Sequence, residues 1–186
     1  IEISDLSAEL IDKMAQSPKL CRHLHIPLQS GDDEILKKMQ RNYCAADYLS
    51  LIKKIKMQIP EIAITTDVLV GFPGEEGAHF KNTLGLIEEI LPLKAHIFPY
   101  SPRQGTQAFS FKNKLNPRTL KERVLKLKAT AEACSFNYKK QFLNKNLDVL
   151  IEGRVKDRPG FWDGYTDNYI KVLVRSNQDL KNQILR

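Results

Sequence analysis

Cysteine is scarce in this sequence, with three in 186 residues, and their spacing argues against several classes of protein. Cys21, Cys44 and Cys134 lie 23 and 90 residues apart. That spacing matches neither the paired cysteines of a small secreted domain nor the common ligand patterns of zinc and iron-sulfur sites. We therefore expect reduced thiols with mainly structural roles, a cytoplasmic location, and no metal ligand among them.

Long apolar runs and a leader segment are also absent. No stretch approaches the roughly 18 apolar residues of a membrane span, and the chain opens at Ile1 with no Met and no signal peptide. We expect no membrane partner and interpret the chain as a piece of a longer protein. With 42% hydrophobic and 27% charged residues, it suits one medium soluble domain with a small appendage.

Acidic residues are sparse in the last part of the chain. Residues 1–111 carry 12 basic and 14 acidic side chains, whereas residues 112–186 carry 17 basic and 8 acidic ones. The net charge therefore changes from −2 to +9 along the chain. A basic segment joined to a nearly neutral body favours a polyanionic partner, most simply nucleic acid bound through its phosphates. The alternative is a solvated, lysine-rich helix face over residues 117–143.

The first two thirds of the chain alternate between strand and helix patterns, which predicts an α/β fold with a parallel sheet or barrel segment. The expected strands span residues 1–3, 22–29, 62–70 and 95–100, and the expected helices span residues 7–15, 32–39, 46–58 and 76–91. A long amphipathic helix follows from Pro117, a residue well suited to a first helical turn.

After Asn146 the pattern changes to a period of two residues, as in 148–152 and 169–174, with turns expected at Gly153, Pro159-Gly160 and Asp163-Gly164. A small β module therefore begins near residue 145. We expect two domains, residues 1–144 and residues 145–186.

The most informative segment, residues 65–75, reads T-T-D-V-L-V-G-F-P-G-E. An apolar strand runs into a turn in which Gly71 and Gly74 bracket Phe72-Pro73, and a helix follows. Glycine permits a sharp turn and a close approach of backbone to ligand, and the helix start offers free N–H groups. The segment predicts a ligand-binding turn, with an ordinary strand-to-helix loop as the alternative.

Polar side chains fall on one face of each inner strand, because side chains alternate along a strand. This face carries His23, His25, Gln29, Thr65, Asp67, His96 and Tyr100. If helices cover the apolar face, the polar face lines a barrel lumen whose carboxyl edge is the place where ligands bind in such folds.

The same face allows a metal site as an alternative. His23 and His25 on one strand, with Asp67 and His96 from its neighbours, would suit Zn²⁺ in a barrel hydrolase. His-x-His is a weak signal by itself, and the strand breaks at Pro27.

Three blocks of sequence, residues 23–31 (HLHIPLQSG), 65–75 and 98–106 (FPYSPRQGT), occur in the order seen in radical S-adenosylmethionine (SAM) methylthiotransferases, and the chain resembles that family. Residues 152–154 and 163–169 are similar to the TRAM module, a small RNA-binding β-barrel. The resemblance implies half of a (βα)6 partial TIM-like barrel followed by a TRAM-like antiparallel β-barrel, which we expect to be truncated at Arg186.

The resemblance also implies an activity and its cofactors. Such enzymes add a 2-methylthio group to a modified adenosine next to the tRNA anticodon, using SAM, two [4Fe-4S] clusters and an electron donor. Thr65-Thr66-Asp67 and residues 96–100 (HIFPY) resemble the branch acting on N6-threonylcarbamoyladenosine. The isopentenyladenosine tRNA and ribosomal-protein branches remain as alternatives, and a non-catalytic RNA-binding module is an alternative of another class.

Site residues follow from the resemblance by position. The SAM-binding set is Gln29, Ser30, Gly31, Asp67, Val70, Gly71 and Tyr100. The tRNA-binding set is Arg103, Arg154, Lys156, Arg158, Tyr165, Tyr169 and Lys171, with cations for phosphates and aromatic rings for unpaired bases.

The chain departs from the family in one respect, since no C-x-x-x-C-x-x-C occurs anywhere. We therefore expect the cluster ligands in a missing N-terminal part, no catalytic residue in these 186 residues, and no activity for them alone. Open strand edges at the missing half make a dimer of the fragment another expected partner state.

Overall fold

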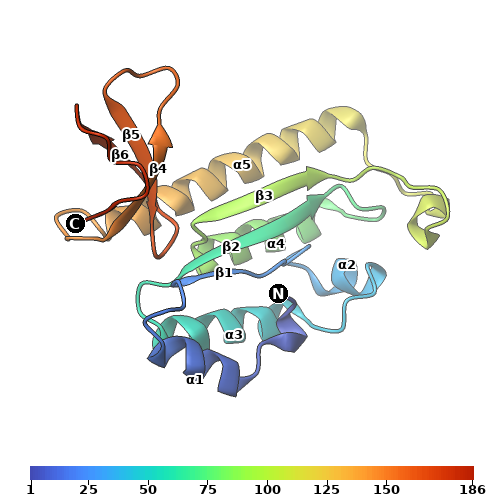
Figure 1. Cartoon of the computed structure of the whole chain (residues 1–186). Helices are drawn as coiled ribbons and strands as arrows, with labels where there is room; N and C mark the ends of the chain where they lie inside the picture. Colours follow the sequence, from blue (N-terminus) through green and yellow to red (C-terminus); the bar gives the residue numbers. More distant parts are fainter.

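The computed structural model describes all 186 residues, and its larger part is a three-stranded parallel sheet with helices packed on it (Figure 1). The strands lie in the order β1 (His23–His25), β2 (Ala63–Val70) and β3 (Lys94–Pro99). Asp67 lies opposite His96 in the register of β2 and β3, and His25 lies opposite Thr65 in that of β1 and β2. The carboxyl ends of the strands therefore share one edge of the sheet.

Five helices accompany the sheet: α1 (Ala8–Gln16), α2 (Asp33–Lys38), α3 (Ala45–Gln58), α4 (Gly77–Ile90) and α5 (Pro117–Lys140). Apolar side chains of β1 and β2, such as Leu24, Ile64 and Val68, join the main core with residues of α3 and α4, whereas the opposite face stays partly open. Helix α5 packs along β3 and α4. This is the predicted α/β arrangement, with one sheet face left as an open inner surface. No helix combines the length and apolarity of a membrane span.

Two of the cysteines have structural roles, as the spacing predicts. The Cys44 sulfur accepts the Asp47 backbone N–H at 3.4 Å, while the Asp47 carboxylate accepts the Cys44 N–H, and together they cap the start of α3. Cys134 is buried in the main core, where its thiol donates to the Ile87 carbonyl. Cys21 is exposed.

The strand predicted for residues 1–3 does not form, so the barrel segment has three strands. Ile3–Asp5 is a turn of 3-10 helix (η1). The amino group of Ile1 donates to the His25 carbonyl at 3.0 Å, which places the start of the chain against the free edge of β1. The backbone closes a local turn instead, since the Asp5 N–H donates to the Glu2 carbonyl at 3.1 Å and the Leu6 N–H donates to the Ile3 carbonyl at 3.4 Å.

The last part of the chain is a curled antiparallel sheet (Figure 1). Its strands are β4 (Val149–Arg154), β5 (Phe161–Thr166), β6 (Lys171–Arg175) and β7 (Ile184–Leu185), in the order β6-β5-β4-β7. A core of four buried side chains supports it, namely Val149, Ile151, Trp162 and Leu180.

Two of the three predicted turns in this sheet are wrong. Pro159-Gly160 is a turn, with Gly160 at φ +80°, but Gly153 lies inside β4 next to a bulge and Asp163-Gly164 lies inside β5. A Cβ on Gly164 would stand 2.2 Å from the Leu150 carbonyl oxygen. Glycine is needed here for close approach of β4 beside a bulge, and not for a turn conformation.

The β module packs against the end of the sheet at which the parallel strands begin (Figure 1). The Tyr138 hydroxyl, on α5, donates to the Glu61 carbonyl at 2.6 Å. The side-chain amide of Asn168 lies within hydrogen-bond distance of both groups, at 3.3 Å from the Glu61 carbonyl and 3.2 Å from the Tyr138 hydroxyl. The module is therefore fixed at the edge opposite the carboxyl ends of the strands.

Candidate functional site

A cavity of about 670 Å³ opens at the carboxyl ends of β2 and β3, where the sequence predicts the ligand-binding edge. We call it the strand-end cavity. Its wall includes Gln29, Leu69, Phe72, Phe98 and Tyr100, and its rim includes Lys38, Arg41 and Arg103. Its size and its mixture of aromatic and polar groups are those of a small-molecule site.

Gln29 enters the cavity wall from a constrained backbone. It has φ +66°, a left-handed conformation that costs energy for a residue other than glycine. Its N–H donates to the Asp67 carbonyl at 2.8 Å, and its carbonyl accepts the Leu69 N–H at 2.9 Å. These two bonds to β2 hold the residue in place, so its side chain has a fixed origin at the cavity.

The Gly-Phe-Pro-Gly turn is held by a buried ion pair. Glu75 accepts the Gly71 N–H at 3.1 Å with one carboxylate oxygen and the Arg123 guanidinium at 2.6 Å with the other. Burial raises the pKa of Glu75, and the hydrogen bonds from Arg123 and from the Gly71 backbone oppose that rise. The Gly71 N–H is thus engaged by a side chain, and the turn supports the cavity through Phe72, whose ring lies edge-on to Tyr100 at 5.4 Å.

The seven residues predicted to bind SAM separate into three groups. Gln29 and Tyr100 line the strand-end cavity. Ser30, Gly31, Val70 and Gly71 are buried in packing. Gly31, for example, lies so near helix α4 that a Cβ would stand 2.6 Å from the Thr83 Cα. Asp67 lies on the open inner face of the sheet.

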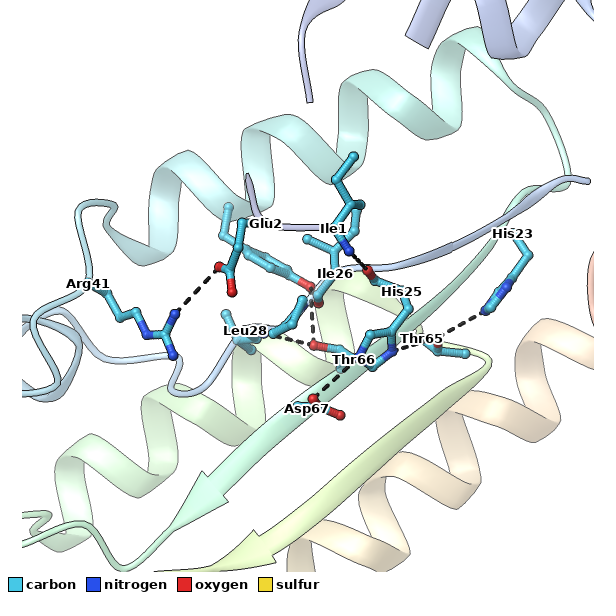
Figure 2. A network of polar contacts seen from close by, with 12 residues as sticks. Ile1, Glu2, His23, His25, Ile26, Leu28, Arg41, Thr65, Thr66 and Asp67 are labelled. Atoms are coloured by element: carbon cyan, nitrogen blue, oxygen red, sulfur yellow. Dashed lines mark hydrogen bonds and ion pairs between the residues drawn. The ribbon is translucent and has the colours of Figure 1, made fainter. Parts of the chain in front are cut away.

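Asp67 belongs to a group of three potential ligands on that face, which we call the polar cluster: His25, Asp67 and His96. Their ligand atoms lie within 4.8 Å of one another. Figure 2 shows the His25 ring between Asp67 and Thr65, with Nε2 3.3 Å from the Asp67 carboxylate and Nδ1 3.0 Å from the Thr65 hydroxyl. Three of the four residues of the predicted metal alternative therefore converge.

His23, the fourth, points elsewhere. Its Nε2 lies 2.9 Å from the Thr65 hydroxyl, and its ring stacks on Tyr169 of the β module at 4.6 Å. Burial lowers the pKa of His23, and the charge of nearby His25 lowers it further.

The predicted tRNA-binding residues also lie in separate places. Arg103 is on the rim of the strand-end cavity. Tyr165, Tyr169 and Lys171 line a second hollow of about 480 Å³ at the other end of the sheet, the amino-end hollow, together with His23 and Lys94. The basic hairpin, which joins β4 to β5, carries the other three: Arg154, Lys156 and Arg158.

Two contributors to the site have only weak signals in the local sequence. Arg123 lies on α5, 48 residues after its partner Glu75. Thr66 faces the core, where its hydroxyl accepts the Leu28 N–H at 3.0 Å and so fixes the irregular segment after β1 (Figure 2). A buried carboxylate directly after a glycine turn and a threonine within an apolar strand are the only hints, since each demands an unseen partner.

Known proteins are similar to this chain in sequence and in fold. Residues 1–87 match the radical SAM superfamily. The chain is 36% identical to the threonylcarbamoyladenosine tRNA methylthiotransferase MtaB of Bacillus subtilis, over all of this chain and 42% of that protein. It is 39% identical to MtaB of Thermotoga maritima, over 92% and 39%. It is 42% identical to the tRNA-2-methylthio-N(6)-dimethylallyladenosine synthase of Alkaliphilus oremlandii, over 82% and 32%.

Solved structures agree on the fold. Coproporphyrinogen III oxidase (HemN) of Escherichia coli, a radical SAM enzyme, superposes with a TM-score of 0.53 at 14% identity, covering 76% of this chain and 31% of that one. Elp3 of Methanocaldococcus infernus gives 0.51 at 14% identity, covering 89% and 51%. The chain spans about two fifths of the length of the MtaB relatives that it matches.

Proposed function

Because the chain belongs to the radical SAM methylthiotransferase family, we propose that its protein adds a 2-methylthio group to N6-threonylcarbamoyladenosine next to the tRNA anticodon. The observation that carries the proposal is identity to tRNA methylthiotransferases along the whole chain. MtaB relatives favour the threonylcarbamoyladenosine substrate. The dimethylallyladenosine synthases, at 36–42% identity, make the dimethylallyl nucleoside the second candidate.

The strand-end cavity fits SAM in size and in lining. Pockets of roughly 300 to 1,000 Å³ hold ligands of this class, and the cavity of about 670 Å³ lies at the carboxyl edge of a barrel sheet. Phe72 and Tyr100 offer aromatic surface for an adenine ring, and Gln29 offers an amide at a fixed position. Asp67 would approach the same ligand from the inner face only if the ligand extends beyond the cavity.

The iron-sulfur clusters do not fit these 186 residues. The Cys44 sulfur caps a helix and Cys134 is buried in the core, so the cysteines provide no set of three thiolates. When present, SAM and the clusters supply the methyl group and the one-electron chemistry of this family. We propose that the cluster ligands and the contact with an electron donor lie outside residues 1–186, and that these residues alone are inactive.

Residues 145–186 serve, in this proposal, as a TRAM-like module that binds tRNA. The supporting observations are the curled four-stranded sheet and the exposed basic hairpin. Most of the charge of +9 over residues 112–186 lies on residues 112–144, at +7, so helix α5 would share the phosphate contacts. Phosphate contacts of this kind position an RNA without reading its sequence. The target nucleotide would then reach the strand-end cavity past Arg103, in the cytoplasm where tRNA is modified.

Nucleoside mass spectrometry of tRNA tests the proposal. A strain lacking the gene should lose 2-methylthio-N6-threonylcarbamoyladenosine and accumulate the unmethylthiolated nucleoside, and the intact gene should restore it. Loss of the methylthiolated dimethylallyl nucleoside instead would move the protein to the second branch. An unchanged content of both nucleosides would refute tRNA methylthiolation.

A further inference from the structure

Three potential metal ligands from three adjacent strands meet on the open inner face of the sheet. His25 lies on β1, Asp67 on β2 and His96 on β3, and their ligand atoms all lie within 4.8 Å of one another. Asp67 and His96 are direct register partners, so the backbone fixes their spacing. Sites built on strands hold their ligands more accurately than sites on loops.

Thr65 orients the His25 ring from behind. Its hydroxyl oxygen lies 3.0 Å from His25 Nδ1 and 2.9 Å from His23 Nε2. A hydroxyl has one proton, so two chains satisfy these bonds: His23 donates to Thr65 and Thr65 to His25 Nδ1, or His25 Nδ1–H donates to Thr65 and Thr65 to His23. In the second chain, His25 Nε2 presents its lone pair toward Asp67. Such a hydrogen bond behind a histidine is the usual support of a metal ligand.

The contact between His25 Nε2 and Asp67 can hold either a proton or a metal ion. The two atoms stand 3.3 Å apart (Figure 2): in the first chain His25 donates a hydrogen bond to the carboxylate, and in the second both atoms offer lone pairs to a metal ion. His96 makes the metal the better occupant, because it brings a third ligand to the same point and its ring lies edge-on to His25.

We propose that His25, Asp67 and His96 bind a divalent transition metal such as Zn²⁺. Two imidazoles and one carboxylate are the donor set of catalytic zinc and non-haem iron sites. Ligands of a zinc ion stand about 3 to 3.5 Å apart, given bonds of about 2 Å. Because the ligand atoms are spread over distances of up to 4.8 Å, the partly exposed side chains of His25 and Asp67 would have to rotate toward one another to reach that size. The remaining coordination positions face the amino-end hollow, which His25 and His96 also line.

The surroundings select the kind of metal. Lys94, Lys139 and Lys171 line the same hollow, and their charges oppose any cation held by electrostatics alone. Mg²⁺ prefers oxygen ligands and depends on charge, whereas Zn²⁺ and Co²⁺ bind imidazole strongly. The site should therefore take Zn²⁺ and Co²⁺ and ignore Mg²⁺. Its ligands are two imidazoles and a carboxylate, and not the cysteines of an iron-sulfur cluster, and the proposal does not depend on the methylthiotransferase function.

Titration of the metal-free 186-residue chain with Co²⁺, followed by its visible absorption bands and by competition with Zn²⁺, tests the site. His96→Ala should abolish the bands. Thr65→Val, which removes the hydroxyl that contacts His25 and His23 and leaves the three ligands in place, should weaken binding about 10- to 100-fold. His79→Gln is the matched control, because His79 lies outside the cluster and caps α4. Circular dichroism of each variant verifies the fold.

The outcomes are distinguishable. Loss of the bands in folded His96→Ala, with His79→Gln unchanged, supports the site. No Co²⁺ spectrum in the unsubstituted chain, a thiolate charge-transfer band, or equal affinity in His96→Ala would each overturn it. Displacement of Co²⁺ by Mg²⁺ would also contradict the proposed ligand set.

Discussion

Replacing Arg123 with Met should destabilise the protein more than most single substitutions, because it leaves the buried Glu75 carboxylate without its positively charged partner. The Glu75 side chain is 3% exposed and Arg123 is 12% exposed. Arg123 also lies over the Phe80 ring, 5.3 Å from its centre, and Met keeps that apolar contact while it removes the guanidinium. Removing one partner of a buried pair costs about 3 to 5 kcal/mol. That is a large part of a domain stability of about 5 to 15 kcal/mol.

The loss should depend on pH. Burial already raises the pKa of Glu75, and loss of Arg123 removes the main opposing hydrogen bond, so the pKa rises further. A carboxyl group whose folded pKa is raised adds stability below its unfolded pKa, and that stability is lost as pH rises through the folded pKa. The difference between Arg123→Met and the unsubstituted protein should therefore grow from acid to neutral pH.

Urea unfolding followed by circular dichroism measures the effect. At neutral pH a loss of about 3 to 5 kcal/mol corresponds to a fall in Tm of roughly 6 to 20 °C for a chain of this size. Glu75→Gln in the Arg123→Met background removes both charges and should recover much of the loss. If the double variant instead shows the sum of the two single losses to within about 0.5 kcal/mol, the pair is uncoupled and the reasoning fails.

Three further predictions concern the β module. Gly164→Ala places a Cβ against the Leu150 carbonyl and should cost about 3 kcal/mol in urea unfolding; an unchanged midpoint would show that the strands can separate freely. Asn168→Ala breaks the buried contacts to Tyr138 and Glu61 and should cost about 1 to 3 kcal/mol, while exposed Asn146→Ala should cost almost nothing. Neutralising the basic hairpin should weaken tRNA binding. The slope of log K against log[salt], measured by filter binding, should become shallower by about 0.9 per lost phosphate contact, and an unchanged slope would show that the hairpin is not part of the interface.

The periodicity of apolar residues predicted most of the secondary structure, because buried strands and amphipathic helices each produce a repeated pattern in the local sequence. Residues 62–70 and 95–100 became β2 and β3 with changes of one residue at their ends. The local sequence gave wrong predictions where the conformation depends on contacts with other parts of the chain. Asp163-Gly164 has the sequence of a turn, and only the position of the neighbouring Leu150 carbonyl shows that it lies in a strand. The Ile1–Ile3 strand does not form because the backbone closes a 3-10 turn there.

The candidate site shows the same division. Alternation along the strands placed His25, Asp67 and His96 on one face, and the structure confirms that they meet. Alternation cannot show that His23 turns to Tyr169, because Tyr169 belongs to a module whose docking depends on long-range contacts. Alternation along the strands also cannot identify Arg123. The buried Glu75 carboxylate requires a positively charged partner, but the local sequence does not show where in the chain that partner lies.

The positions of the two basic regions limit how an RNA can lie on the molecule. Arg103 stands at the carboxyl end of the sheet, and the β module packs at the amino end. Strand β2 has 8 residues between these ends, which spans roughly 26 Å at about 3.3 Å per residue. One nucleotide cannot touch both regions, so a tRNA that uses both must run along the sheet. Substitutions in the basic hairpin should then act on tRNA affinity, while Arg103→Ala should act on the entry of the target nucleotide.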